Sequence, residues 1–181
     1  MKLTAKQKIL ITLYIFCFVI FLVLFILFSE QIKALFFVTG FILLNIFISA
    51  YKKNFQFPIE IEILTLGIFF CTYFYGINAG LIVGIVGGLL SSVLYGYVSL
   101  FLIPMIIGNM LVAVLTPLFS PLHYSLAGII LTIIKNGFVF MIYHFVFGYN
   151  IGKNLSFSIS NILLNIVLFL NIAPFLMLVM N

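Results

Sequence analysis

Long apolar runs fill most of the 181-residue sequence, and short clusters of polar residues, tyrosines and glycines separate them. Seven of these runs have about the 17–25 residues that a helix needs to cross a bilayer. They are Ile9–Phe28, Ala34–Ala50, Pro58–Tyr75, Gly80–Ser99, Leu100–Phe119, Ser125–Gly148 and Asn161–Met180. Because the alternating pattern of a membrane β-barrel is absent from these runs, the sequence predicts an all-α, polytopic transmembrane helical bundle of six to seven spans.

The composition is that of a protein that lies within a bilayer. Hydrophobic residues make up 66% of the chain and charged residues 6%, whereas a soluble domain carries about 25% charged residues. So few charges cannot cover a water-facing surface. We therefore expect a single integral membrane domain over residues 1–181, with an extra N-terminal span at about 9–28 and a core at about 34–180.

Most of the lysines lie between the predicted spans, where they indicate the orientation of the chain. With a cytoplasmic N-terminus, the inside segments hold six lysines and the outside segments hold Lys33. The six are Lys2, Lys6, Lys8, Lys52, Lys53 and Lys153. We therefore expect a multi-pass protein of the cell membrane, in contact with the lipid bilayer, with its N-terminus in the cytoplasm. The net charge of +5 forms no basic cluster of the kind that binds nucleic acid, so nucleic acid is excluded as a partner.

Small residues recur at every fourth position of one segment, at Gly76, Gly80, Gly84, Gly88, Ser92 and Gly96. On a helix, this spacing forms a ridge to which a neighbouring backbone can approach closely. The ridge predicts either tight helix packing inside the chain or docking of another membrane subunit. No strand precedes these glycines, so a dinucleotide-binding loop is not expected.

Two carboxylates, Glu60 and Glu62, open the third predicted span. Near a helix N-terminus, a carboxylate is stabilised by roughly 0.3–1 kcal/mol, which is one explanation of their position. Alternatively, one of them lies at the mouth of a cavity, where it binds a cationic substrate or pairs with a lysine. Residues two apart on a helix point to different sides, which disfavours a joint acid–base role.

Lys135 and Asn136 lie in the middle of the sixth predicted span. A lysine at the centre of a bilayer costs roughly 2.5–3.5 kcal/mol on insertion scales, so it usually faces a cavity, a partner or a ligand. If the span is misplaced, Lys135 instead extends to the membrane surface. Asn161 and Asn165, one helical turn apart, either form hydrogen bonds between helices or contact a ligand, and Asn109 has the same two interpretations.

The sequence does not favour catalysis or metal binding. Ser91 or Ser92 together with His144 would be the components of a serine hydrolase, but no nucleophile-elbow pattern surrounds the serines. Cys17 and Cys71 lie inside apolar runs and are expected to act as small hydrophobic residues. We therefore expect a protein that is not an enzyme and that has no metal and no cofactor.

The sequence resembles the substrate-binding S components of energy-coupling factor (ECF) transporters. The matching residues are Ile59-Glu60-Ile61-Glu62, the turn Phe74-Tyr75-Gly76, and the glycine-stepped helix with Ala79, Gly80 and Gly84. The resemblance extends over about residues 34–180, because the later helices fit the same six-helix plan. It implies a membrane subunit that captures a vitamin-like micronutrient and docks on a T subunit driven by paired ATPases.

The bacterial cell-shape protein MreD, a scaffold of the wall-elongation machinery, resembles the same stretch through a comparable turn and glycine-stepped helix. In that family an acidic residue often follows the glycine-stepped helix, whereas this chain has Ser91 and Ser92 there and contains no aspartate. In both families the aromatic-glycine turn is cytoplasmic, whereas the lysine count with seven spans places Gly76 outside.

The preferred hypothesis from sequence is an S-component-like uptake subunit that binds a small-molecule substrate. Its pocket would be bordered by Glu60, Glu62, Lys135, Asn136, Asn161 and Asn165, and the ridge over residues 76–96 would dock the partner subunits. The competing hypothesis is a scaffold of the MreD type, which acts in cell-envelope or cell-shape assembly and transports nothing.

Overall fold

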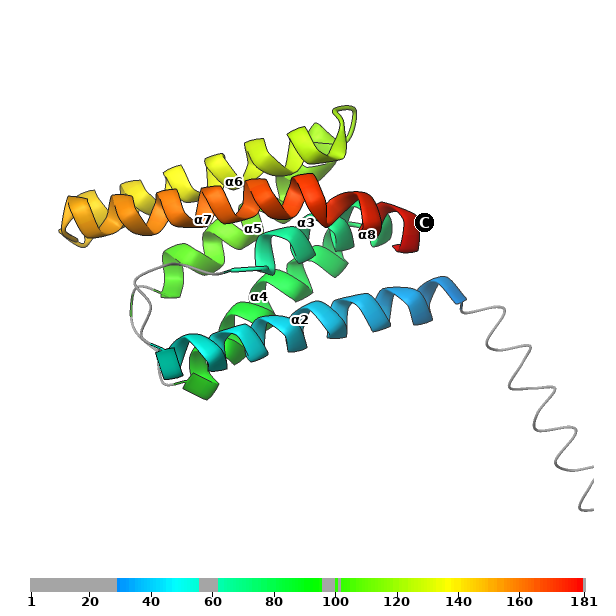
Figure 1. The fold of residues 1–181 in the computed structure, drawn as a ribbon, viewed down its shortest axis with the longest axis horizontal. Helices are drawn as coiled ribbons and strands as arrows, with labels where there is room; N and C mark the ends of the chain where they lie inside the picture. The colour runs from blue at the N-terminus through cyan, green and yellow to red at the C-terminus, as the bar shows by residue number, and fades with distance from the viewer. Residues whose placement is uncertain (1–28, 56–61, 96–99, 101, 181) are drawn as a thin grey trace, which may run out of the picture. The chain divides into compact units, whose positions relative to one another are not determined.

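A computed structural model of the chain describes residues 29–55, 62–95, 100 and 102–180 (Figure 1). The chain divides into two compact units, Met1–Leu35 and Phe36–Asn181. The described elements are helical throughout. They are α2 (Ser29–Phe55), α3 (Leu64–Tyr75), α4 (Ile77–Tyr95), α5 (Leu102–Phe119), α6 (Tyr124–Met141), the π-helical turn η1 (Ile142–Val146), α7 (Ile151–Asn171) and α8 (Ala173–Met180). The predicted span Ile9–Phe28 lies outside the described residues.

Five of the described helices are long and apolar enough to cross a membrane, by length and composition. These segments are Ser29–Ala50, Ile77–Leu94, Leu102–Phe119, Tyr124–Val146 and Ile151–Asn171. Their exposed side chains include many large hydrophobic residues, as expected for surfaces that face lipid. The prediction of an all-helical structure is confirmed for the described part of the chain, and these five helices are compatible with a multi-pass membrane protein.

Helix α3 is a short buried helix that packs against α4, α5, α6, α7 and α8. Its first nine residues are all buried. Twelve residues make a helix of about 18 Å, which is shorter than the roughly 30 Å hydrocarbon core. The sequence placed the start of this span at Pro58, and that boundary is wrong, because Glu62 and Ile63 are not helical and the helix begins at Leu64.

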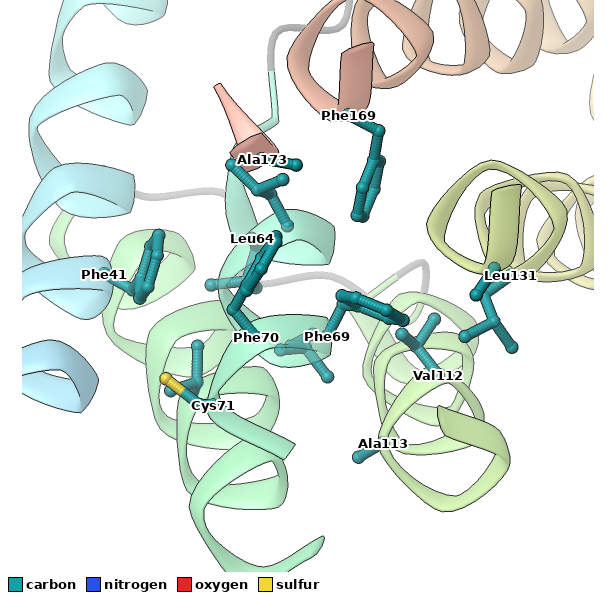
Figure 2. Close-up of a cluster of buried hydrophobic side chains, with 14 of the residues drawn as sticks. Phe41, Leu64, Phe69, Phe70, Cys71, Val112, Ala113, Leu131, Phe169 and Ala173 are labelled. Atoms are coloured by element: carbon teal, nitrogen blue, oxygen red, sulfur yellow. The ribbon is translucent and has the colours of Figure 1, made fainter. Parts of the chain in front are cut away.

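Aromatic rings from α3 and α7 form the centre of the core (Figure 2). The ring centroids of Phe69 and Phe169 lie 5.4 Å apart in an edge-to-face arrangement, and Phe70 lies 5.3 Å from Phe69. Gly128 of α6 lets the Phe169 ring approach, because a Cβ at this position would collide with the ring. The core therefore depends on an aromatic residue of α7 that fits against a glycine of α6.

The central glycines of the ridge on α4 pack inside the chain. A Cβ at Gly80 would collide with the Thr72 hydroxyl of α3, and a Cβ at Gly84 would lie 3.1 Å from Asn109 Cβ of α5. Gly88 is also buried and faces the same two helices. The Asn109 side chain donates a hydrogen bond to the Gly84 carbonyl at 3.1 Å. These three positions therefore serve helix packing within the chain, which is the first of the two alternatives.

The ends of the ridge have other surroundings. Gly76 joins α3 to α4 with a φ of 89°, and its N–H donates to the Thr72 carbonyl at 2.9 Å. A positive φ strains other residues, so this turn favours glycine. Ser92 donates a hydrogen bond to the Gly88 carbonyl of its own helix at 2.9 Å. Gly96 lies outside the described residues.

Helix α7 begins ten residues before the span predicted at Asn161–Met180, so that boundary is wrong. Asn150 caps its N-terminus by accepting hydrogen bonds from the backbone N–H groups of Gly152 and Lys153. The helix ends at Asn171, and Pro174 near the start of α8 lacks the N–H that a continuous helix would need.

The polarity of α7 explains why its start is hidden in the sequence. Its buried residues are Asn154, Ser158, Asn161, Asn165 and Phe169. Apolar side chains such as Leu155, Ile159, Leu163 and Val167 are exposed on the outer face. Because the polar face points inward, the average hydropathy of the segment falls and it resembles a polar connection.

Candidate functional site

A buried ion pair joins the N-terminal end of α3 to the middle of α6. Lys135 Nζ lies 2.6 Å from Glu62 Oε1, and the side chains are 3% and 8% exposed. Among the described residues, these are the two charged ones that are buried. Lys135 also donates to Thr65 Oγ1 at 2.9 Å, one turn into α3. The lysine therefore lies inside the bundle, and the alternative that it extends to the membrane surface is wrong.

Two helices determine the position of the lysine. Lys135 lies on the buried face of α6, with Thr132 and Val139 on the preceding and following turns. Gly108 of α5 faces its aliphatic chain, and a Cβ at this glycine would lie 3.3 Å from Lys135 Cγ. The glycine leaves room for the stem, so the ammonium group reaches the end of α3.

Three asparagines extend the network from the other carboxylate oxygen of Glu62. Asn161 Nδ2 of α7 donates to Glu62 Oε2 at 2.8 Å. Asn161 Oδ1 in turn accepts from Asn165 Nδ2 at 2.7 Å and from Asn136 Nδ2 at 3.5 Å. The amide dipoles are therefore aligned with their N–H groups toward the carboxylate, which stabilises its negative charge.

The network ends in an acceptor atom. Asn165 is fully buried, and its Oδ1 atom has no hydrogen-bond partner in the described part of the chain. A buried acceptor without a partner costs about 1–3 kcal/mol. The site thus offers a position for one donor group, two hydrogen bonds away from the carboxylate of Glu62.

The predicted pocket residues lie together, with one residue outside the described range. Glu62, Lys135, Asn136, Asn161 and Asn165 form one connected network. Glu60 lies outside the described residues. Of the alternatives for the glutamates, pairing with a lysine is the arrangement that Glu62 adopts.

The sequence did not indicate Thr65 and Gly108 as parts of this site. Thr65 follows Glu62 by three residues in a segment that is otherwise apolar, which is a weak signal for a polar contact. Gly108 stands one residue before Asn109, and a glycine inside an apolar helix is common in membrane proteins. Both residues act through neighbours that are distant in sequence, so local pattern could not have identified them.

The residues considered for catalysis form hydrogen bonds with backbone carbonyls rather than with one another. Ser91 and Ser92 donate hydrogen bonds to the Gly88 carbonyl of their own helix. His144 Nδ1 lies 3.3 Å from the Tyr149 carbonyl oxygen, at the C-terminal end of the π-helical turn. Within the described ranges, no three His, Cys, Asp or Glu side chains come together as metal ligands would.

The arrangement is suited to holding a charged group of a small molecule. One cation, one carboxylate and several amides lie close together among buried residues, where charge–dipole contacts are strong. These groups can recognise polar and charged groups of another molecule through hydrogen bonds and ion pairs.

No family model, curated protein or solved structure matches this chain. The resemblances to ECF S components and to MreD therefore stay predictions from the sequence.

Proposed function

We propose that this chain is a membrane-embedded substrate-capture subunit of an uptake transporter, with a role like that of an ECF S component. The buried pair of Lys135 and Glu62, extended by Asn161, carries the proposal. In this role the chain binds a vitamin-like micronutrient between its helices and docks on a T subunit with paired ATPases. The network around the ion pair is the proposed binding site.

The energetics of burial favour a ligand site over a purely structural role. Replacing a buried ion pair by well-packed hydrophobic residues is often neutral or stabilising by about 1–4 kcal/mol. A bundle that needed only stability would therefore fill the space between α3, α6 and α7 with apolar side chains. Ionisable residues inside a membrane bundle are typical of substrate and ion pathways.

The short helix α3 supports the same proposal. Transporters commonly bind substrate where a discontinuous helix ends near the middle of the membrane, because the free backbone dipoles there face the substrate. Glu62 and Ile63 form the non-helical approach to α3, and the polar network lies at this point. Non-helical backbone at such depth is tolerated when protein surrounds it.

A scaffold of the MreD type is the second candidate, and one observation favours it. Most polar atoms of the network pair with each other, so the site is held together without a ligand. In a scaffold, such a network would fix the relative positions of the helices. The two functions predict different bound molecules: a capture subunit retains a small-molecule substrate, whereas a scaffold retains envelope or division proteins.

Purification from the native membrane in mild detergent tests the proposal. Small molecules and co-purifying proteins are identified by mass spectrometry for the wild type and for Asn161→Leu. Asn154→Leu is the matched control, because Asn154 lies on the same face of α7 but donates to the Phe140 carbonyl instead.

A small molecule that is retained by the wild type and the control but lost from Asn161→Leu would support capture, as would recovery of a T subunit with ATPases. Recovery of envelope or division proteins, with no small molecule in any sample, would overturn the transport proposal and favour the scaffold.

A further inference from the structure

We infer that the site recognises a carboxylate of its substrate, and that Glu62 occupies the carboxylate position when no substrate is bound. This inference rests on the proposed capture function and names the chemical class of the substrate. The geometry behind it is the convergence of donors on both oxygens of one carboxylate. Lys135 Nζ contacts Oε1 at 2.6 Å and Asn161 Nδ2 contacts Oε2 at 2.8 Å.

The two donor side chains lie on continuous helices. Lys135 lies eleven residues after the start of α6, and Asn161 lies ten residues after the start of α7. Their positions are held by complete helical turns on both sides and by direct contact between the two helices. A pair of donors on continuous helices keeps its spacing when the acceptor is exchanged.

The acceptor belongs to a non-helical segment. Glu62 precedes the N-cap residue of α3, Ile63, so its backbone lies before the first turn of the helix. The Glu62 backbone can move by changes in a few dihedral angles, whereas the backbones of Lys135 and Asn161 are each held within a long helix. Exchange of the carboxylate is therefore the less costly way to open the site.

Charge balance points to an anionic substrate group. When Glu62 leaves, the remaining site holds Lys135 and the Asn161 amide N–H, which already point toward the vacated position. A carboxylate restores neutrality there. A cationic group would instead have to displace Lys135 from Glu62, and this would leave the lysine buried without a partner, which is strongly unfavourable.

The free Oδ1 atom of Asn165 adds a second requirement. It is a buried acceptor two hydrogen bonds from the carboxylate position. A hydroxyl or N–H group a few bonds away from the carboxylate of the substrate would donate to it. We therefore expect a substrate that carries a carboxylate and a nearby donor, and this second contact allows it to compete with the tethered Glu62.

Chemical rescue of Glu62→Ala tests the inference. The variant is prepared in detergent in the presence of acetate and then compared in acetate, propionate, chloride and methylammonium at equal ionic strength. We expect the carboxylates to raise the midpoint of thermal unfolding saturably, by roughly 3–6 °C, and the other ions to have no such effect. Glu62→Ala/Lys135→Met is the second variant. It removes both charges, and its midpoint is expected not to respond to carboxylates.

The donor requirement is tested with γ-hydroxybutyrate and butyrate on the same Glu62→Ala protein. We expect γ-hydroxybutyrate to bind several-fold more tightly than butyrate, and the difference to disappear in Glu62→Ala/Asn165→Leu. Asn154→Leu in the Glu62→Ala background is the control, in which we expect the difference in affinity between the two ligands to remain.

Different experimental results would overturn this inference and the proposed function. Equal effects of chloride and acetate, or stabilisation by methylammonium, would overturn the carboxylate inference even if the wild type retains a small molecule. Rescue by acetate in a protein that carries no small molecule from its native membrane would leave the carboxylate site standing and would overturn the capture function.

Discussion

Lys135 Nζ and Glu62 Oε1 lie 2.6 Å apart inside the bundle, although 73 residues separate them in the sequence. The contact joins α6 to the non-helical approach to α3, and Asn161 adds α7 to the same carboxylate. Helices α6 and α7 and the segment before α3, which are distant in sequence, therefore come together at the Glu62 carboxylate. The stability of the bundle and the proposed substrate site depend on the same few groups.

The ion pair predicts strong coupling between its two residues. Glu62→Gln and Lys135→Met should each lower the free energy of unfolding by about 3–5 kcal/mol, because each leaves one buried charge without its partner. The double variant should lose much less than the sum of the single losses. Unfolding in mild detergent, followed by circular dichroism, measures the cycle. Additive losses would show that the two residues act independently.

Two asparagines one turn apart on α7 should respond to different extents to the same substitution. Asn161→Leu removes a hydrogen bond to a charged carboxylate and should destabilise the protein by about 1.5–3 kcal/mol. Asn165→Leu removes a buried acceptor that has no partner, but it also removes the hydrogen bonds that Asn165 Nδ2 donates to Asn161, so the two effects oppose each other and the net loss should be smaller. Thermal unfolding of the two variants, side by side, measures the contrast. Equal destabilisation would contradict the assignment of Asn165 to a ligand contact.

Two glycines of α6 offer a matched pair for the packing of the core. Gly128→Ala places a Cβ against the Phe169 ring and should destabilise the protein by about 1–3 kcal/mol, as overpacked cores do. Gly137→Ala meets nothing within 4 Å and should be neutral or stabilising by up to about 1 kcal/mol, from helix propensity. Unfolding midpoints in detergent measure both. Similar midpoints would mean that Phe169 can move away from α6 at little cost.

Much of the helical pattern was predictable because hydropathy is a local property. The run Leu100–Phe119 coincides with α5 to within two residues, and Ser125–Gly148 corresponds to α6 and the following π-helical turn. The candidate site was predictable for a related reason, since a lysine or asparagine inside an apolar run is costly and seldom lacks a partner.

The structure differs from the sequence-based predictions where tertiary contacts determine the local conformation. Nothing local distinguishes Glu62 from the first turn of a helix, and its carboxylate is held by side-chain contacts with α6 and α7. The start of α7 was placed too late because Asn154 and Ser158 lower the hydropathy while facing the interior. The pairing of Glu62 with Lys135 depends on how α3, α6 and α7 pack, and a single sequence does not contain that information in readable form.

The orientation of the bundle is testable at two exposed positions. Successive spanning helices alternate in direction, so Asn78 in the first turn of α4 and Lys153 in the first turn of α7 lie at opposite ends of the bundle (Figure 1). Helix α2 ends at the same end of the bundle at which α7 begins (Figure 1), and Lys52 and Lys53 belong to the C-terminal part of α2. The excess of lysines at that end predicts that it is cytoplasmic.

Single cysteines at these two positions measure the orientation with a membrane-impermeant maleimide. In a background with Cys17→Ala and Cys71→Ala, we expect Asn78→Cys to react in intact cells and Lys153→Cys to react only after permeabilisation. The reverse result would place the turn at Gly76 in the cytoplasm, where ECF S components and MreD have theirs, and would show that the lysine bias does not set the topology. The expected result places that turn outside, so any partner that docks from the cytoplasm must approach the other end of the bundle.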